Sequence, residues 1–301
     1  MDPVSFACCL AAMFCWGAAP VMYRFCGDEL SPQKMQTMRS LVFFITSLFV
    51  MRFLPSGDIF PGVVPILVYI TVTMVDLGVG DTLYFMCVAR IGAGKASALA
   101  NTYPLYVVTF SWLLFGEGLS PLGLLGAVAV VAGIALLCLF KEQGTSETYG
   151  HRPIREGLLL GVCAGLCWGT GMPVTRWLMT RTTIGASELM FWRSTALCLY
   201  SCLVYIPTRL SGRDKSPFLR AFLTPKGSLM VVSGLFVLML PGWLSTYAAA
   251  RASAALMAPI TGSAPMVAAL MGHWLFKERL TPAQWLGVVS IITGGVMVNL
   301  L

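Results

Sequence analysis

The stretch PLYVVTFSWLLFGEGLSPLGLLGAVAVVAG, residues 104–133, has a second copy in the same chain. The copy is PMVAALMGHWLFKERLTPAQWLGVVSIITG, residues 265–294, and the two align without a gap. The matching positions are Pro104 and Pro265, Glu117 and Glu278, Leu119-Ser120-Pro121 and Leu280-Thr281-Pro282, Gly126 and Gly287, and Gly133 and Gly294. Chance does not place a proline, an acid, a second proline and two glycines in one frame, so the chain consists of two similar halves.

The repeat extends outward from this stretch over most of the chain. Further matching pairs are Trp16-Gly17 and Trp168-Gly169, Arg24 and Arg176, Arg39-Ser40 and Arg193-Ser194, and Ala89-Arg90 and Ala250-Arg251. A polar segment at 143–156 separates the copies. We therefore predict a first repeat at 1–142, a linker at 143–156 and a second repeat at 157–301.

The composition excludes a soluble globular protein. The chain of 301 residues is 57% hydrophobic and 11% charged, with a mean hydropathy of +0.80, whereas soluble domains carry about 25% charged residues. The start lacks a basic region and its apolar run is long enough to remain as a span, so no signal peptide is expected. The net charge of +7 is assigned to loops facing the cytoplasm rather than to a nucleic-acid partner.

Long apolar runs predict an all-α polytopic membrane protein. We expect spans at about 4–23, 35–54, 62–88, 93–115 and 119–140, and again at about 157–178, 185–207, 228–249, 253–276 and 281–301, each near the length that a bilayer requires. The runs are too long and continuous for barrel strands. Five spans per half is an odd number, so the second half enters the membrane from the opposite side. The ten helices then form two inverted five-helix repeats, as in many transporters.

The duplicated motifs resemble the EamA-type members of the drug/metabolite transporter superfamily. The resemblance rests on Trp16-Gly17 and Trp168-Gly169, on Arg39 and Arg193, and on the two Pro-x12-Glu-x-Leu-[Ser/Thr]-Pro blocks, and it covers essentially the whole chain. It implies ten helices in two inverted repeats and a central cavity lined mainly by the first, third, fourth, sixth, eighth and ninth spans. It also implies transport of small organic solutes such as amino acids, amines, drugs and metabolites.

Two carboxylates, Asp76 and Asp81, fall inside the third expected span. Their counterparts in the second half are Val237 and Gly242, so the shared scaffold does not require them. A carboxylate at membrane depth is costly and marks a functional site by default. We expect Asp81, with Asp76, to bind a substrate ammonium group or to carry a coupling proton, the alternatives being a structural pair with Arg39 or a polar kink. At about 140° apart around an α-helix, the two are expected to face different ways.

Aromatic and polar residues on the spans expected around the cavity are candidates for its lining. Aromatic faces near a carboxylate suit an organic cation or a flat apolar group, and ordinary packing is the alternative. Pro104 and Pro265 lie inside the fourth and ninth spans and are expected to kink them, which frees backbone carbonyls. The candidate substrate-binding residues are Asp81, Asp76, Tyr84, Trp16, Trp168, Asn101, Tyr103, Trp243, Tyr247 and Ser263.

Duplicated charged residues are interpreted as gate or structural residues. Arg39 and Arg193 occur once in each half, and a guanidinium can hold a substrate carboxylate or a helix end. Glu117 and Glu278 precede short connections in which Ser120 and Thr281 are good helix N-caps, so these acids are expected to hold backbone N–H groups. With Pro104 and Pro265 these four residues form the predicted gate and scaffold set.

We interpret the chain as an alternating-access transporter, most naturally an exporter, of amino acids, amines or organic cations, with a possible proton coupling. The alternatives are a nucleotide-sugar or phosphate-ester exchanger of the same superfamily, which needs a basic cavity, and a channel. An enzyme is disfavoured because the sequence lacks a Walker loop, a His-Glu-x-x-His motif and a Gly-x-Ser-x-Gly motif. No cofactor and no metal site is expected.

The expected partners are a small-molecule substrate and the lipid bilayer of a prokaryotic inner membrane, with the protein a monomer or homodimer. Basic residues gather on the loops of the linker side, while the other side carries only Arg52, Arg176, Arg181 and Arg251. The positive-inside rule then places the linker in the cytoplasm and both termini outside. The resemblance implies the reverse, with both termini inside, so the sequence leaves the orientation open.

Overall fold

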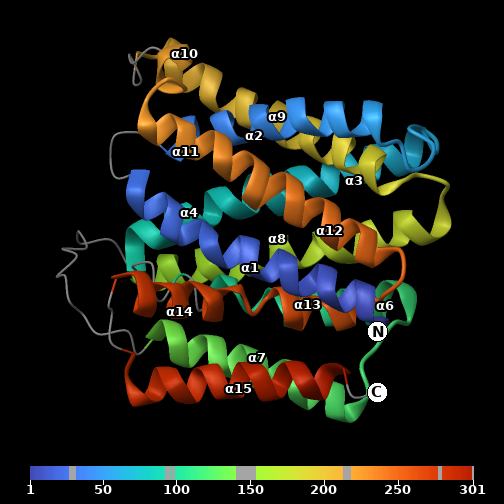
Figure 1. The fold of residues 1–301 in the computed structure, drawn as a ribbon, viewed down its shortest axis with the longest axis vertical. Coiled ribbons are helices and arrows are strands. Elements are labelled where there is room, and N and C mark those ends of the chain that lie inside the picture. The colour runs from blue at the N-terminus through green and yellow to red at the C-terminus, as the bar shows by residue number, and fades with distance from the viewer. Residues whose placement is uncertain are drawn as a thin grey trace.

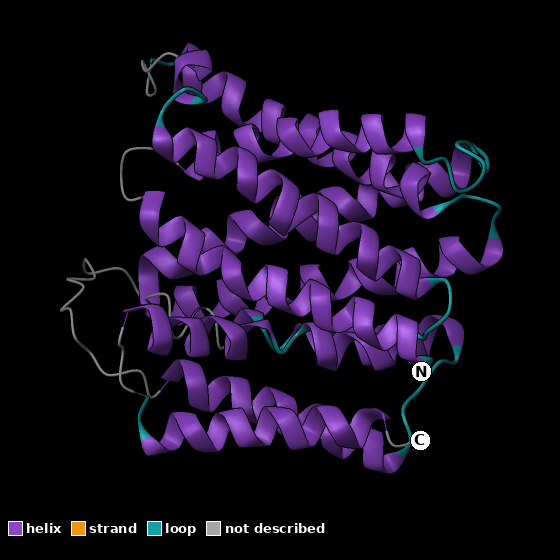
Figure 2. Cartoon of the chain, in the orientation of Figure 1, coloured by secondary structure: helices purple, strands orange, loops and turns teal. Residues whose placement is uncertain are grey.

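The computed structural model describes residues 1–26, 32–91, 96, 99–139, 154–212, 218–276 and 280–299, and nearly all of these are helical (Figure 2). The first half contains α1 (Pro3–Cys26), α2 (Pro32–Phe53), α3 (Val63–Thr73), η2 (Met74–Val79), α4 (Gly80–Ile91), α6 (Tyr103–Phe115) and α7 (Pro121–Leu139). The second half contains α8 (Ile154–Arg181), α9 (Ala186–Leu210), α10 (Phe218–Ala221), α11 (Pro225–Ser233), η3 (Gly234–Met239), α12 (Leu240–Ala249), α13 (Ala254–Thr261), α14 (Ala264–Phe276) and α15 (Pro282–Asn299). The expected all-helical class is confirmed.

Five stretches in the described part of the chain are long and apolar enough to cross a membrane. They are Val63–Tyr84, Arg155–Arg181, Ala186–Leu210, Pro225–Ala249 and Ala254–Leu275. Shorter apolar helices cover Pro3–Ala19, Tyr103–Phe115, Pro121–Leu137 and Pro282–Val298. Many large apolar side chains point outward from these helices, as expected where lipid replaces water. The full set of ten spans stays a prediction.

The helices lie roughly parallel to one another and run between two ends of the molecule (Figure 1). One end holds both chain termini and the connections at 54–62, 116–120, 182–185 and 250–253, and we call it the terminal end. The other end holds the end of α7 and the beginning of α8, and we call it the linker end. In the described residues α1 runs from the terminal end to the linker end, whereas α8 runs the opposite way.

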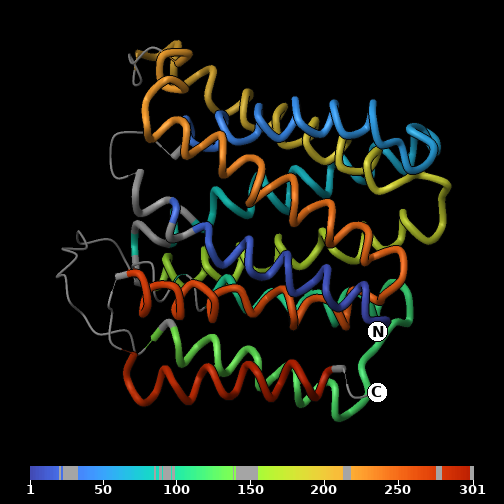
Figure 3. The backbone as a smooth tube through the Cα atoms, in the orientation of Figure 1, coloured from blue at the N-terminus to red at the C-terminus, as the bar shows by residue number. Residues whose placement is uncertain are grey.

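Helices α7 and α15 lie side by side along one edge of the molecule (Figure 3). A Cβ added at Gly126 would lie 2.6 Å from the carbonyl of Gly294, and one at Gly287 would lie 2.7 Å from the carbonyl of Gly133. Gly287 and Gly294 are the repeat counterparts of Gly126 and Gly133. Each helix thus offers its partner the same two glycines, the self-complementary arrangement of a two-fold contact.

The crossing of α7 and α15 has its centre at a pair of repeat counterparts. Ser290 Oγ donates to the carbonyl of Ala129 at 2.7 Å, and these residues are 161 positions apart, which is the offset of the repeat. A residue touches its own counterpart only near a two-fold axis. The local two-fold relation between the last helices of the two halves is therefore carried by glycines that the sequence shows as duplicated.

Helices α2 and α9 cross in the same manner on the other side of the molecule. The hydroxyl groups of Ser47 and Ser194 form a buried hydrogen bond. Thr37 Oγ1 donates to the carbonyl of Ser201 at 3.4 Å, one part of the same contact. Arg39 lies on α2 and Arg193 lies on α9, so this crossing brings the two repeat-related arginines onto neighbouring helices.

Two helices each contain one π-helical turn, and the turns lie at corresponding places in the two halves. The first, η2, separates α3 from α4, and the second, η3, separates α11 from α12. The two segments are one residue out of register with the repeat. A π turn bonds residue i to residue i+5 and commonly marks a functional site.

The kinks expected at Pro104 and Pro265 are instead breaks between helical segments. Pro104 is in the first turn of α6, after a turn at residues 101–102, and Pro265 is the second residue of α14, after a turn at residues 262–263. Proline is tolerated in the first turn of a helix, where its missing N–H has no intrahelical partner. The chain therefore begins a new helix at each proline instead of bending an existing one.

Candidate functional site

Two ion pairs join aspartates of the first half to the arginines of α2 and α9. Asp76 lies in η2 and its Oδ2 accepts from an Arg193 guanidinium nitrogen at 2.8 Å. Asp81 lies in the first turn of α4, and its Oδ2 lies 3.5 Å from an Arg39 guanidinium nitrogen. Asp76 is buried at 5% exposure and Arg39 at 7%. Each carboxylate predicted at membrane depth therefore has a guanidinium partner, as buried charges require.

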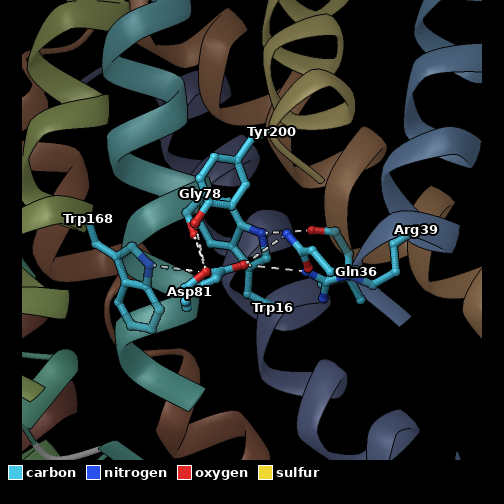
Figure 4. Close-up of polar contacts among 9 residues, drawn as sticks. Trp16, Gln36, Arg39, Gly78, Asp81, Trp168 and Tyr200 are labelled. Carbon is cyan, nitrogen blue, oxygen red and sulfur yellow. Dashed lines mark hydrogen bonds and ion pairs between the residues drawn. The ribbon is translucent and has the colours of Figure 1, made fainter. Parts of the chain in front are cut away.

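Asp81 is the better coordinated of the two carboxylates. Trp168 Nε1 donates to Asp81 Oδ1 at 3.1 Å, and Gln36 Nε2 donates to Asp81 Oδ2 at 3.4 Å. Arg39 also donates to Gln36 Oε1, which fixes the amide and the guanidinium together. Figure 4 shows Asp81 between the indole of Trp168 on one side and Gln36 and Arg39 on the other. Since α8 supplies Trp168 and α2 supplies the rest, the carboxylate joins the two halves.

The prediction that Asp76 and Asp81 face different ways is wrong, because it assumed a regular α-helix between them. The π turn between them bonds the N–H of Gly80 to the carbonyl of Val75, five residues earlier, so residues five apart stack over one another. Both carboxylates accordingly reach the same face of α8, Asp81 at Trp168 and Asp76 at Gly171, three residues apart. The extra residue of the π turn therefore lines up the two ion pairs.

Glycines provide the room for this arrangement. A Cβ added at Gly171 would overlap the Asp76 carboxylate, and one at Gly80 would lie 2.8 Å from the Trp168 ring. A Cβ at Gly78 would lie 2.7 Å from the ring of Tyr200. Tyr200 in turn forms a hydrogen bond of 2.9 Å with Thr82. The backbone of η2 thus approaches α8 and α9 more closely than any residue with a side chain allows.

Three of the predicted aromatic residues form one group beside Asp81. The Trp168 ring lies 5.2 Å from that of Tyr84 and 6.4 Å, edge to face, from that of Tyr103. The Tyr103 hydroxyl is 3.3 Å from Thr261 Oγ1 of α13. Tyr84 and Asp81 both contact Trp168, and the three rings form an aromatic wall next to the carboxylate.

Trp16 occupies the place in the first half that Trp168 has in the second. Its Nε1 donates to the carbonyl of Val237, in η3, at 2.9 Å. Each of these repeat-related tryptophans therefore bonds to the broken helix of the opposite half, Trp168 to a carboxylate and Trp16 to a backbone carbonyl. The two halves share this geometry. Their chemistry differs because the acidic side chains occur only in the first half.

The remaining predicted lining residues lie away from the two carboxylates or are held by their own helix. Trp243 stacks on Tyr247 at 5.9 Å and donates to Ser187 Oγ at 3.2 Å. The ring of Tyr247 lies beneath the guanidinium of Arg251, so this pair belongs to the terminal end. Ser263 donates to the carbonyl of Pro259 at 2.7 Å, and Asn101 lies in the turn before α6.

Glu117 makes a different contact from the one expected. Glu117 binds the guanidinium of Arg176 at 3.2 Å instead of a backbone N–H. Ser120 and Thr281 do cap their helices, since they accept from the N–H groups of Gly123 and Gln284. Glu278 lies outside the described residues.

Sequence reasoning missed four residues of the site: Gln36, Gly171, Tyr200 and Thr261. Gln36 precedes Arg39 by three residues and so shares its helical face, a signal present in the sequence. The position of Gly171 three residues after Trp168 is a second signal of that kind. Nothing in the sequence indicates the pairing with Tyr200 or Thr261, because those contacts are made between helices distant in the chain.

Known proteins are similar to this chain over most of its length. A family model described as the EamA-like transporter family matches residues 5–139 and 155–300. An uncharacterized transporter of Archaeoglobus fulgidus is 26% identical over 289 residues, which is 94% of this chain and 93% of that protein. Protein PecM of Dickeya dadantii is 23% identical over 230 residues, covering 74% of this chain and 70% of its own.

A solved crystal structure shares the fold. It superposes with a TM-score of 0.80 and 16% identity, covering all of this chain and 98% of its own. At that identity the likeness concerns the fold alone. The matches of the family model fall on either side of the polar linker, so both copies of the repeat carry the family's pattern.

Proposed function

The chain belongs to the EamA-like transporter family, and from this premise we propose that it moves small organic solutes across a membrane by alternating access. Its relatives in Archaeoglobus fulgidus and Helicobacter pylori are named as transporters, which supports a non-enzymatic role. The apolar helices support a multi-pass integral membrane protein. Because these relatives are archaeal and bacterial, we propose a prokaryotic inner membrane as its location.

We propose that the ten helices form two inverted five-helix repeats. Support comes from the opposite directions of α1 and α8 between the two ends of the molecule. The reciprocal glycine contacts of α7 and α15 add a local two-fold relation between the last helices of the halves. In such an arrangement the two halves rock about a site near the middle, which then faces one side of the membrane at a time.

The two aspartate–arginine pairs carry the proposal for the site. A bare cation that bound Asp81 would compete with Arg39 and leave a guanidinium buried without its anion, which is strongly unfavourable. A solute with both an ammonium and a carboxylate group replaces both partners at once, its ammonium on Asp81 and its carboxylate on Arg39. We therefore place zwitterionic amino compounds ahead of simple amines within the expected substrate class.

The aromatic wall favours a solute with an apolar or flat side chain. Trp168 and Tyr84 lie next to Asp81, and Tyr103 lies against Trp168. An ammonium group beside these rings also gains a cation–π contribution of about 0.5–2 kcal/mol. In this proposal Asp76 with Arg193 is the second pair, which can take over the solute or a coupling proton when the other half moves.

The test is a thermal-shift screen of the purified protein with three ligands of one skeleton: phenylalanine, phenethylamine and 3-phenylpropionate. Stabilisation by phenylalanine that is lost in Asp81→Asn supports the zwitterion site, since a ligand that binds only the native state raises the melting temperature. Asp58→Asn is the matched control, because Asp58 is exposed at the terminal end. Spermidine and a nucleotide sugar test the polyamine and phosphate-ester alternatives.

Counterflow in proteoliposomes separates a carrier from a channel. A carrier exchanges unlabelled internal solute for labelled external solute and accumulates the label transiently, whereas a channel only equilibrates it. Stabilisation by the nucleotide sugar, unchanged in Asp81→Asn, would contradict the acidic site and favour Arg39 and Arg193 as anion ligands. Equilibration without transient accumulation would contradict alternating access.

A further inference from the structure

Two separate sets of polar contacts tie the first half to the second half at the terminal end. One set joins Ser56 of the α2–α3 connection to Glu188 of α9. The other joins Glu117 of the α6–α7 connection to Arg176 of α8. Their acids differ in burial and in how completely their oxygens are bonded, and this difference assigns the two contacts different roles.

The Ser56–Glu188 contact is fully bonded, and its α9 side is buried although Ser56 itself is exposed. The backbone N–H and the hydroxyl of Ser56 donate to the two oxygens of Glu188 at 3.0 and 2.8 Å, and Glu188 is 2% exposed. Ser187 donates to the carbonyl of Leu54 at 2.8 Å, and its N–H donates to Ser56 Oγ. Breaking this set would expose several buried polar groups at once, so it is costly to open.

The Glu117–Arg176 contact is partly exposed and incompletely bonded. The pair is 3.2 Å apart, and the side chains are 27% and 18% exposed, respectively. Oε2 of Glu117 is buried and has no hydrogen-bond partner among the described residues. A buried carboxylate oxygen without a partner raises the free energy of the paired state. When the pair separates, that oxygen becomes hydrated, so the contact is easier to open than the one at Ser56.

The local structure directs Glu117 towards α8. Gly116 has a φ of +68°, and the N–H groups of Gly116 and Glu117 bond to the carbonyls of Trp112 and Ser111. The bond from Gly116 to Trp112 is that of the αL ending of a helix, which fixes the residue that follows it. Arg176 meanwhile donates to the carbonyl of Ala249, the last residue of α12, at 2.8 Å. One arginine thus ties together three elements that surround the terminal end.

The same arginine is connected through α8 to the central site. Arg176 lies five residues after Gly171, which is about 7.5 Å along the helix axis. Gly171 adjoins the carboxylate of Asp76. A cavity of about 310 Å³ lies directly against the pair and is lined by Phe115, Glu117, Arg176, Trp177, Thr180 and Arg181. The pair therefore lines a cavity at the terminal end, and its arginine lies on α8, the helix that also adjoins Asp76.

We propose that Glu117 and Arg176 form the gate of the terminal end, with this cavity as the vestibule through which a solute reaches or leaves Asp76. The Ser56–Glu188 contact remains closed and acts as the pivot. The repeat places an acid, Glu278, and an arginine, Arg24, at the counterpart positions in the sequence, so both members of the pair are duplicated. The proposal rests on the transport function proposed above.

The test is carboxyl footprinting of the purified protein, in which a water-soluble carbodiimide couples an amine to exposed carboxylates and mass spectrometry measures each site. In Glu117→Gln and in Arg176→Gln we expect labelling of Asp76 to rise about fivefold, the factor that corresponds to a loss of about 1 kcal/mol. Glu156→Gln is the matched control, because it removes a 3.4 Å pair with Arg90 between the halves at the linker end. It should leave Asp76 labelling unchanged.

A charge reversal separates a gate from a simple structural contact. The double variant Glu117→Arg/Arg176→Glu should return Asp76 labelling to the wild-type level, because the pair is restored in the opposite sense. Labelling of Asp76 that does not change in either single variant would overturn the gate, and so would a rise of the same size in Glu156→Gln. Counterflow by the wild-type protein is the separate readout for transport, so the gate can fail while transport stands.

Discussion

At the residue scale, the pair of Asp76 with Arg193 makes a sharp prediction about stability. Asp76→Asn leaves a buried guanidinium without its anion, which should lower the free energy of unfolding by about 3–5 kcal/mol. The double variant Asp76→Asn/Arg193→Gln removes both charges and should recover most of that loss. Thermal unfolding of the two single variants and the double variant measures the coupling between them.

The control for this cycle is the exposed pair of Arg90 with Glu156. Glu156 is 58% exposed and the pair is 3.4 Å apart, so Glu156→Gln should change stability by less than about 1 kcal/mol. Additive losses for Asp76→Asn and Arg193→Gln would show that the two residues do not depend on one another, and the ion pair would then have no role in holding the halves together.

A second prediction concerns Gly171, where the smallest possible side chain is already too large. A Cβ would overlap the Asp76 carboxylate, so Gly171→Ala should displace Asp76 and weaken solute binding by roughly 10-fold, about 1.4 kcal/mol. Gly295→Ala is the matched control because nothing lies within 4 Å of its added Cβ. Equal thermal shifts with phenylalanine in the two variants would show that the added methyl group does not displace Asp76.

At the element scale, the crossing of α7 and α15 predicts that four glycine-to-alanine substitutions lower stability by similar amounts. An added methyl group at Gly126, Gly133, Gly287 or Gly294 meets a backbone carbonyl of the other helix. Overpacking of this kind costs about 1–3 kcal/mol. We expect each alanine variant to lower the midpoint of thermal unfolding by a similar amount, with counterparts Gly126 and Gly287 matching most closely. A loss at only one of those two positions would contradict the two-fold contact.

The elements also show how far the sequence alone reaches. The duplicated proline, acid and glycine positions predicted the two halves, and those glycines do form the contact between α7 and α15. The prediction based on regular α-helical geometry was wrong at η2, because an apolar sequence carries no signal of the extra residue in a π turn. That one turn decides whether Asp76 and Asp81 diverge or reach the same face of α8.

The candidate site was predicted by residue type and only in part by pairing. Asp76, Asp81, Arg39 and Arg193 stood out because charge at membrane depth is costly. A structural pair with Arg39 was one of the alternatives for the aspartates, and Asp81 does pair with Arg39. The pairing of Asp76 with Arg193 could not be assigned, because the repeat aligns the arginines with one another and leaves both aspartates without counterparts. Glu117 was likewise found, yet its partner Arg176 depends on how α8 packs against the α6–α7 connection, which is a tertiary contact.

At the scale of the whole molecule, the uneven distribution of basic residues predicts the orientation. Among the described residues the terminal end carries Arg52, Arg176, Arg181 and Arg251, and the expected spans assign most other lysines and arginines to the linker side. Cytoplasmic loops carry the excess of basic residues. We therefore expect the linker in the cytoplasm and both termini outside. The gate of Glu117 and Arg176 then opens to the exterior, and export ends when the solute is released through it.

Fusions at the C-terminus test this orientation directly. Alkaline phosphatase is active only outside the cytoplasm and green fluorescent protein fluoresces only inside it, so the phosphatase fusion should be active and the fluorescent fusion dark. Fusions within the linker at 143–156 should give the opposite pair of results. A fluorescent C-terminal fusion would contradict the charge rule for this chain and agree with the orientation that the family resemblance implies. The same gate would then control access from the cytoplasm, and an exporter would open it to load its solute rather than to release it.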